Sequence, residues 1–152
     1  MSNYRGHLIG GVGVYALAAF LLSLGTYGVG NHLVWFLATM AGALFPDIDV
    51  RSKGQHLFLS ILLLLLIMCL FLQAYIPVVM LLFFSVLPIV IPHRSLFHDL
   101  GFVVFLTAVV SLALIYFLPG KAESIVTTSL FFLLGVISHL VLDKGWRGTF
   151  SK

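Results

Sequence analysis

Charge is what this sequence lacks most. Lys, Arg, Asp and Glu together make up 9% of the 152 residues, whereas hydrophobic residues make up 61%. An ordinary soluble domain carries about 25% charged residues. So few charged side chains cannot cover the surface of a water-soluble core built by a chain of this length. The composition therefore excludes a conventional soluble globule and predicts a protein whose surface faces lipid.

Other absences narrow the function classes. The single cysteine, Cys69, lies in an apolar run, which excludes a disulfide framework or a cysteine-based zinc site within one chain. The sequence has no basic stripe with interleaved aromatic residues, so nothing in it suggests nucleic acid as a partner. The chain also has no His-Glu-x-x-His motif and no Gly-x-Ser-x-Gly motif, which counts against two common types of hydrolase.

Long apolar runs are present instead, separated by short polar stretches. A membrane-spanning helix needs roughly 17 to 25 mostly apolar residues. Six candidate spans follow from this criterion: Leu8–Tyr27, His32–Phe45, Leu57–Ala74, Ile76–Ile91, Phe97–Leu118 and Ser124–Leu142. The second and fourth are short, and the fourth contains Pro77 and Pro88, so both are expected to be tilted or broken. The predicted fold is an all-α integral membrane protein, a compact bundle of about six transmembrane helices.

No linker or repeat divides the chain, so residues 1–152 are expected to form a single transmembrane helical domain. Small residues would let its helices approach closely in lipid. They are Gly6, Gly10, Gly11, Gly13, Ala38, Ala41, Gly42, Gly135 and Ser138.

The distribution of basic residues predicts the orientation. With six spans, one side of the membrane holds most Lys and Arg side chains, and the other holds only Lys121. The first group consists of Arg5, Arg51, Lys53, Arg94, Lys144, Arg147 and Lys152. Because cytoplasmic loops are enriched in Lys and Arg, both termini are expected in the cytoplasm. We interpret the first span as an uncleaved helix rather than a signal peptide, because its apolar run continues past the plausible cleavage point.

Acidic and histidine side chains gather on the same predicted side. They are Asp47, Asp49, Asp99, Asp143, His7, His56, His93, His98 and His139, with only His32 and Glu123 opposite. Charged groups at membrane depth are costly and are usually paired or functional. A bound cation is the simplest explanation, because carboxylates and neutral imidazoles are its ligands. His7 and His56 each begin a span, where a ligand role and a hydrogen-bonded anchor are both open.

Two of these groups have an informative spacing. His139 and Asp143 are four residues apart, so they lie on one helix face and can reach one metal; a helix-end salt bridge is the alternative. Asp47 and Asp49 follow the second span, where an extended turn would let both carboxylates point the same way. The alternative there is an ordinary turn with an aspartate as the next helix cap.

A third group surrounds the start of the fifth span. His93 and His98 are five residues apart, which would separate them by about 140° on one helix. We therefore expect His93 in the preceding loop and His98 in the first helical turn, with Ser95 as a candidate N-cap. Asp99 has an ordinary explanation as an acid in a first helical turn, and its ligand role stays open.

Arg94 is the basic residue we single out. Its planar guanidinium suits a pair of phosphate or carboxylate oxygens, and the alternative is an anchor to lipid headgroups. Lys144 and Arg147 have the same two interpretations, with anchoring favoured.

Taken together and in this order, these motifs resemble the YdjM-like, LexA-regulated family of membrane-bound metal-dependent hydrolases. The matching features are His7, the segment from Gly42 to Asp49, the segment from His93 to His98, and the segment from Gly135 to Asp143. One departure is that Phe97 and Asp99 flank the second histidine, where the family pattern has Thr and Ser.

The resemblance implies a bacterial inner membrane protein that binds one or two divalent metal ions. The metal-facing residues that it implies are His7, Asp47, Asp49, His93, His98, His139 and Asp143. The family is similar in its His and Asp signature to zinc-dependent phospholipases, so zinc is favoured, while manganese and iron also suit such ligands.

The function that we predict is hydrolysis of a phosphoester-containing lipid at the cytoplasmic membrane surface. Asp49 or His98 would act as general base, and Arg94 would contact the phosphate. Membrane lipids are the expected partners. The alternatives are a transporter of metal ions or protons and a noncatalytic membrane module in which the metal is a structural staple. The oligomeric state does not follow from the sequence.

Overall fold

The computed structural model describes residues 4–22, 27–47, 53–71 and 96–150. All regular structure in these residues is helical, with no strand. In chain order the elements are α1 (Tyr4–Leu21), α2 (Val29–Leu44), the 3-10 turn η2 (Phe45–Asp47), α3 (Lys53–Phe71), α5 (Leu100–Phe117), the 3-10 turn η3 (Pro119–Lys121) and α6 (Ala122–Phe150).

Three stretches of the described chain are long and apolar enough to cross a membrane: Val29–Asp47, Leu100–Phe117 and Pro119–Gly145. The prediction of an all-helical chain with apolar spans is confirmed, but the number of six spans is not. The predicted fourth span, Ile76–Ile91, lies outside the described residues. The second span is longer than predicted, because α2 begins earlier and continues through η2 to Asp47.

Helix α6 also extends beyond its predicted end. It continues to Phe150 across a break at Gly145, where φ is 72° and ψ is 167°. A positive φ is accessible to glycine because it has no Cβ. The polar stretch that follows Leu142 suggested a helix end, whereas the glycine lets the chain change direction and resume a helix.

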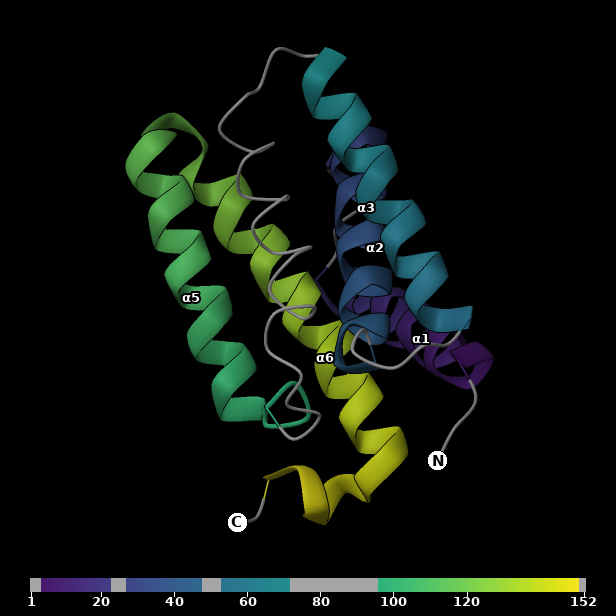
Figure 1. The fold of residues 1–152 in the computed structure, drawn as a ribbon. Helices are drawn as coiled ribbons and strands as arrows, with labels where there is room; N and C mark the ends of the chain where they lie inside the picture. The colour runs from purple at the N-terminus through teal and green to yellow at the C-terminus, as the bar shows by residue number, and fades with distance from the viewer. Residues whose placement is uncertain (1–3, 23–26, 48–52, 72–95, 151–152) are drawn as a thin grey trace.

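Helices α2 and α6 form the centre of the bundle and lie side by side (Figure 1). A Cβ on Gly42 would lie 2.0 Å from the Phe132 carbonyl oxygen, and one on Gly135 would lie 2.1 Å from the Thr39 carbonyl oxygen. The two backbones are therefore in direct contact at these glycines, as predicted for small residues in a membrane bundle.

Helix α1 contacts both central helices through two further glycines. A Cβ on Gly10 would meet Leu142 and Ser138 of α6, and one on Gly11 would meet Met40 and Ala43 of α2. Helix α5 packs on α6, and α3 packs on α2 (Figure 1). Gly13, which we grouped with these residues, makes no close contact, because a Cβ added there would have nothing within 4 Å.

Much of the outer surface is apolar. Phe20, Val29 and Tyr116 are each more than 80% exposed, and Phe105 and Leu112 are about two-thirds exposed along one side of α5. A soluble monomer rarely exposes so much apolar surface. This distribution is what a surface in contact with lipid tails requires.

Of the two buried apolar clusters among the described residues, the larger contains Phe45 and Phe97. Phe45 packs edge-on against Phe97 and Phe132, at ring-centroid distances of 5.5 and 5.3 Å. Leu44, Val136 and Leu140 belong to the same apolar cluster. Since Phe45 precedes Asp47 by two residues and Phe97 directly precedes His98, this core supports the polar residues considered next.

Candidate metal centre

Four polar side chains converge at one end of the bundle. Asp47 comes from η2, His98 from the turn before α5, and His139 and Asp143 from α6. One candidate ligand atom from each residue lies within 4.8 Å of the others. Three stretches of chain that are distant in sequence therefore meet in a group that could hold a metal ion.

The distances inside this group suit a shared cation better than direct hydrogen bonds. His139 Nε2 lies 3.7 Å from Asp47 Oδ1 and 3.5 Å from Asp143 Oδ2. His98 Nε2 lies 3.7 Å from Asp47 Oδ1 and 3.9 Å from Asp143 Oδ2. These separations exceed the usual range of hydrogen bonds. Two ligands of a tetrahedral zinc ion lie about 3.4 Å apart, because each bond is about 2.0 to 2.1 Å long.

The orientation of His139 is fixed by a backbone contact. Its Nδ1–H donates to the carbonyl oxygen of Ala43 on α2, at 2.7 Å. In that tautomer the lone pair belongs to Nε2, which faces the two carboxylates and has no hydrogen-bond partner among the described residues. Metal-binding histidines are commonly held in this way, with one nitrogen on a carbonyl and the other free for the metal.

The spacing argument for α6 agrees with the structure. His139 and Asp143 lie on one face of the helix, and their side chains approach within 3.5 Å. The side chain of Asp143 is 7% exposed and that of His139 is fully buried, whereas those of Asp47 and His98 are 26% and 15% exposed. The group is thus closed on the α6 side and open on the side of Asp47 and His98.

His7 lies beside the group without belonging to it. Its ring is fully buried and stacks on the His139 ring, with a centroid distance of 3.7 Å and an interplanar angle of 14°. His7 Nε2 lies 3.5 Å from Asp143 Oδ1. The start of α1 therefore meets the cytoplasmic end that we predicted for α6, and His7 is close enough to support the same centre.

The donor set fits a divalent cation. Buried imidazole nitrogens without a hydrogen-bond partner in the described part of the chain are found on His7, His98 and His139. Burying polar atoms without a partner is costly. A metal ion would satisfy the nitrogen atoms that face the carboxylates and would offset the repulsion between Asp47 and Asp143.

The other residues that we considered for the site either lie outside the described residues or are described away from the group. Asp49, His93 and Arg94 lie outside the described residues. His56, whose role was open, is exposed and is not part of the group. His32 lies away from the centre, where its Nδ1 is 2.9 Å from the Tyr15 hydroxyl.

The start of α5 differs from our expectation. His98 lies in a turn and not in the first helical turn, because α5 begins at Leu100. Asp99 is the N-cap, and its side chain accepts a hydrogen bond from the Phe102 amide at 3.1 Å. An aspartate is among the preferred N-cap residues. The cap places His98 just outside the helix, where its ring can face α6.

Because the Asp99 side chain caps α5, a capping role and a role as metal ligand can be distinguished by mutation. Asp99→Ala is expected to lower the free energy of unfolding by about 1 kcal/mol, the usual cost of losing an N-cap. Asp99→Asn keeps a capping oxygen and should preserve stability. Both variants should keep bound metal, measured by elemental analysis of detergent-purified protein. Loss of metal from Asp99→Asn protein would instead identify Asp99 as a ligand.

Two contacts of the centre had no signal in the sequence. Lys144 Nζ donates to the His98 carbonyl oxygen and so ties the turn before α5 to α6, one residue before the break at Gly145. Sequence reasoning favoured only an anchoring role for Lys144. The contact between His139 and the Ala43 carbonyl was also missed, since a backbone acceptor leaves no trace in residue type.

Comparison with known proteins assigns the chain to a family. No curated protein and no solved structure matches the chain. The model of the YdjM inner membrane protein family matches residues 1–149. Because that match covers nearly the whole sequence, the chain belongs to the YdjM inner membrane protein family.

Proposed function

We propose that this protein is a metal-dependent hydrolase of the inner membrane that acts on a phosphoester-containing lipid. The observation that carries the proposal is the convergence of Asp47, His98, His139 and Asp143 at the ends of membrane-spanning helices. Helix ends in a membrane protein lie near the level of the lipid headgroups. A centre at that level is accessible to the phosphate of a lipid without the lipid leaving the bilayer.

Each residue of the centre has a role in this proposal. His139, His98, Asp47 and Asp143 would hold a divalent ion, with zinc favoured and manganese or iron compatible with the same ligands. When bound, the ion would polarise a phosphoryl oxygen and activate water for attack. His7 packs against His139 and keeps water away from its buried side.

The open side of the centre indicates where a substrate approaches. Asp47 and His98 are the more exposed pair, and His7 and His139 are fully buried. We propose that the phosphate enters from the side of Asp47 and His98. Because His98 Nε2 faces both carboxylates, the geometry favours a ligand role for His98, which leaves Asp49 as the better general-base candidate. Arg94 is proposed to bind the phosphate through its guanidinium.

A noncatalytic metal staple is the second candidate function. It is favoured by the fact that the group joins the end of α2, the turn before α5 and the end of α6. The hydrophobic effect contributes little to the association of helices in lipid, so a shared ion would stabilise the bundle. Transport of metal ions or protons has less support, because the described core that continues from the centre into the bundle is apolar.

The test is hydrolysis by purified protein reconstituted with a panel of phospholipids that differ in headgroup. We expect a lipid product, detected by mass spectrometry and phosphorus NMR, that forms with added divalent metal and not after chelation. Asp47→Ala should lower the rate of hydrolysis by at least about 100-fold. Mutation of a residue that only orients a metal ligand already lowers activity by up to about 100-fold, and Asp47 is proposed as a ligand itself. His56→Ala, which changes an exposed histidine outside the group, should leave the rate unchanged.

Metal-loaded protein that hydrolyses no lipid of the panel would contradict the hydrolase proposal and favour the staple. Uptake of labelled metal into proteoliposomes would favour transport instead.

A further inference from the structure

The two histidines of the metal-ligand group are held in different ways. The His139 ring is fixed through its second nitrogen, because Nδ1 donates to the Ala43 carbonyl oxygen. The His98 ring has no such support in the described part of the chain, where its buried Nδ1 has no hydrogen-bond partner. Metal-binding histidines are usually oriented through that second nitrogen. Among the described residues, the position of His98 therefore depends on the backbone that carries it.

The turn that carries His98 offers one backbone acceptor to another element. Phe97 before it is fully buried, and Asp99 after it is the N-cap of α5. In a continuing helix the Phe102 amide would reach back to the His98 carbonyl. Here that amide donates to the Asp99 side chain instead. The carbonyl oxygen of His98 is therefore available to a donor from outside α5.

Lys144 supplies that donor. Its Nζ donates to the His98 carbonyl oxygen, and the residue directly follows Asp143 on α6. Lys144 is also the last residue before the break in α6 at Gly145. The contact therefore joins the part of α6 that carries two of the candidate ligands to the turn that carries His98.

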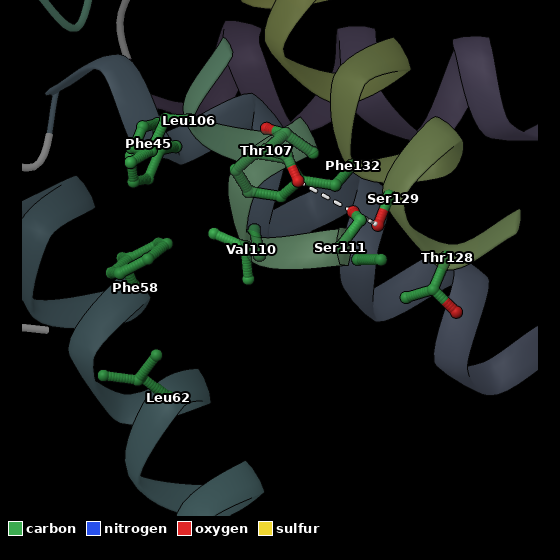
Figure 2. Close-up of a pocket in the computed structure, with 12 residues that line it drawn as sticks. Phe45, Phe58, Leu62, Leu106, Thr107, Val110, Ser111, Thr128, Ser129 and Phe132 are labelled. Carbon is green, nitrogen blue, oxygen red and sulfur yellow. Dashed lines mark hydrogen bonds between the residues drawn. The ribbon is translucent and has the colours of Figure 1, made fainter. Parts of the chain in front are cut away.

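The other connections between α5 and α6 are far from this contact. The two helices run antiparallel and are joined by η3 at the end away from the metal-ligand group (Figure 1). A hydrogen bond between the Ser111 and Ser129 hydroxyls, 2.7 Å apart, links them nearer the middle (Figure 2). Lys144 follows Ser129 by 15 residues, which is about 22 Å along a helix. The serine pair is therefore too distant to set the position of His98.

We propose that Lys144 is a positioning residue of the metal centre, which holds the His98 ring against the two carboxylates by binding the His98 carbonyl oxygen. The inference rests on the metal-binding part of the proposed function and does not require hydrolysis. His98 Nε2 lies 3.7 Å from Asp47 and 3.9 Å from Asp143. A small movement of the turn would take this nitrogen out of reach of an ion that the carboxylates share.

The charge of Lys144 makes this role distinguishable from a purely electrostatic one. A positive charge near a cation site repels the ion, so its removal alone should strengthen metal binding. Loss of the contact with His98 should instead weaken binding, because loss of a group that orients a ligand lowers metal affinity by about 10- to 100-fold. The two explanations therefore predict effects of opposite sign.

The experiment measures the Zn²⁺ affinity of the full-length protein in detergent, by competition with a chromophoric chelator. Lys144→Met has a similar length but cannot donate, and it should bind Zn²⁺ about tenfold more weakly. Lys144→Arg keeps a donor and should restore the affinity. Lys121→Met is the matched control, because Lys121 is an exposed lysine of η3 at the opposite end of the helix pair. It should bind Zn²⁺ as the unchanged protein does.

A double-mutant cycle tests whether Lys144 acts through His98. His98→Ala protein has already lost the ligand, so adding Lys144→Met should weaken Zn²⁺ binding no further. The visible absorption of Co²⁺-loaded protein reports the ligands and their geometry. It should change in the same direction in Lys144→Met and His98→Ala protein, and stay unchanged in Lys144→Arg protein. Lys144→Gln, which has a shorter side chain, provides a second variant should Lys144→Met fail to fold.

Equal or tighter Zn²⁺ binding by Lys144→Met protein would overturn the proposal, as would an equal loss of affinity in the presence and absence of His98. Either result would leave the proposed hydrolase intact. Metal binding that depends on Lys144, in a protein that hydrolyses no lipid, would support the positioning role and contradict the enzyme. Failure of the unchanged protein to bind any divalent metal would contradict both.

Discussion

His139→Ala protein is expected to retain less than about a tenth of the metal bound by the unchanged protein, since even indirect disturbance of a ligand costs 10- to 100-fold in affinity. His139 Nε2 is within 3.7 Å of both carboxylates, and its Nδ1 is held by the Ala43 carbonyl. No other described residue of α6 places a side-chain nitrogen between these two carboxylates. Elemental analysis of detergent-purified protein measures this loss.

His56→Ala provides the control, because His56 is exposed and lies outside the group. It should bind as much metal as the unchanged protein. Equal metal content in His139→Ala and His56→Ala protein would show that the converging residues are not a metal site, and the hydrolase proposal would fall with it.

Gly135→Ala is expected to have a large effect on stability. The added Cβ would lie 2.1 Å from the Thr39 carbonyl oxygen and 2.8 Å from the Ala43 amide nitrogen. Both atoms belong to the α2 backbone and cannot move as a flexible side chain could, so α2 and α6 must separate. We expect a loss of about 3 kcal/mol or more, at the upper end of overpacking effects. Denaturation of the protein in mild detergent measures the loss.

Gly13→Ala is the matched control on α1, because nothing lies within 4 Å of the added methyl group. Alanine favours a helix over glycine, so this variant should be more stable by about 0.5 to 1 kcal/mol. If the two alanine variants were equally stable, the backbone contact between α2 and α6 would be wrong. Separation of these helices should also release metal, because Asp47 and His139 lie on opposite sides of that contact.

The helical fold followed from composition and run length, because lipid leaves few alternatives to helices for an apolar chain. The ends of the helices were harder to predict from the sequence. Gly145 was not predicted to let α6 continue, since a glycine after a helix signals a stop as readily as a bend. The start of α5 was misplaced because a serine and an aspartate both precede it, and capping preference does not choose between them.

The centre was predictable to the extent that its residues share one helix. His139 and Asp143 are linked by a four-residue spacing, which has a geometric meaning. The approach of Asp47 and His98 has no such local rule and depends on packing between α2, α5 and α6. The position of His7 on the His139 ring depends in turn on Gly10 and Gly11, which bring α1 against both central helices.

The apolar space that Phe58, Leu62, Val110 and Phe132 line among the described residues (Figure 2) had no sequence signal at all. Its lining residues come from α2, η2, α3, α5 and α6 and look like ordinary apolar or hydroxyl-bearing residues of each element. Only the way in which the helices are spaced leaves room there, and spacing between helices is a tertiary property.

The contact between His7 and Asp143 also has a consequence for how the protein is made. Translation produces His7 before Asp143, which follows it 136 positions later in the chain. A nascent chain that has not yet reached α6 therefore holds this histidine without the carboxylate that it will meet. The contact can form only after α6 has been made, so any metal loading that needs both α1 and α6 must follow the synthesis of α6.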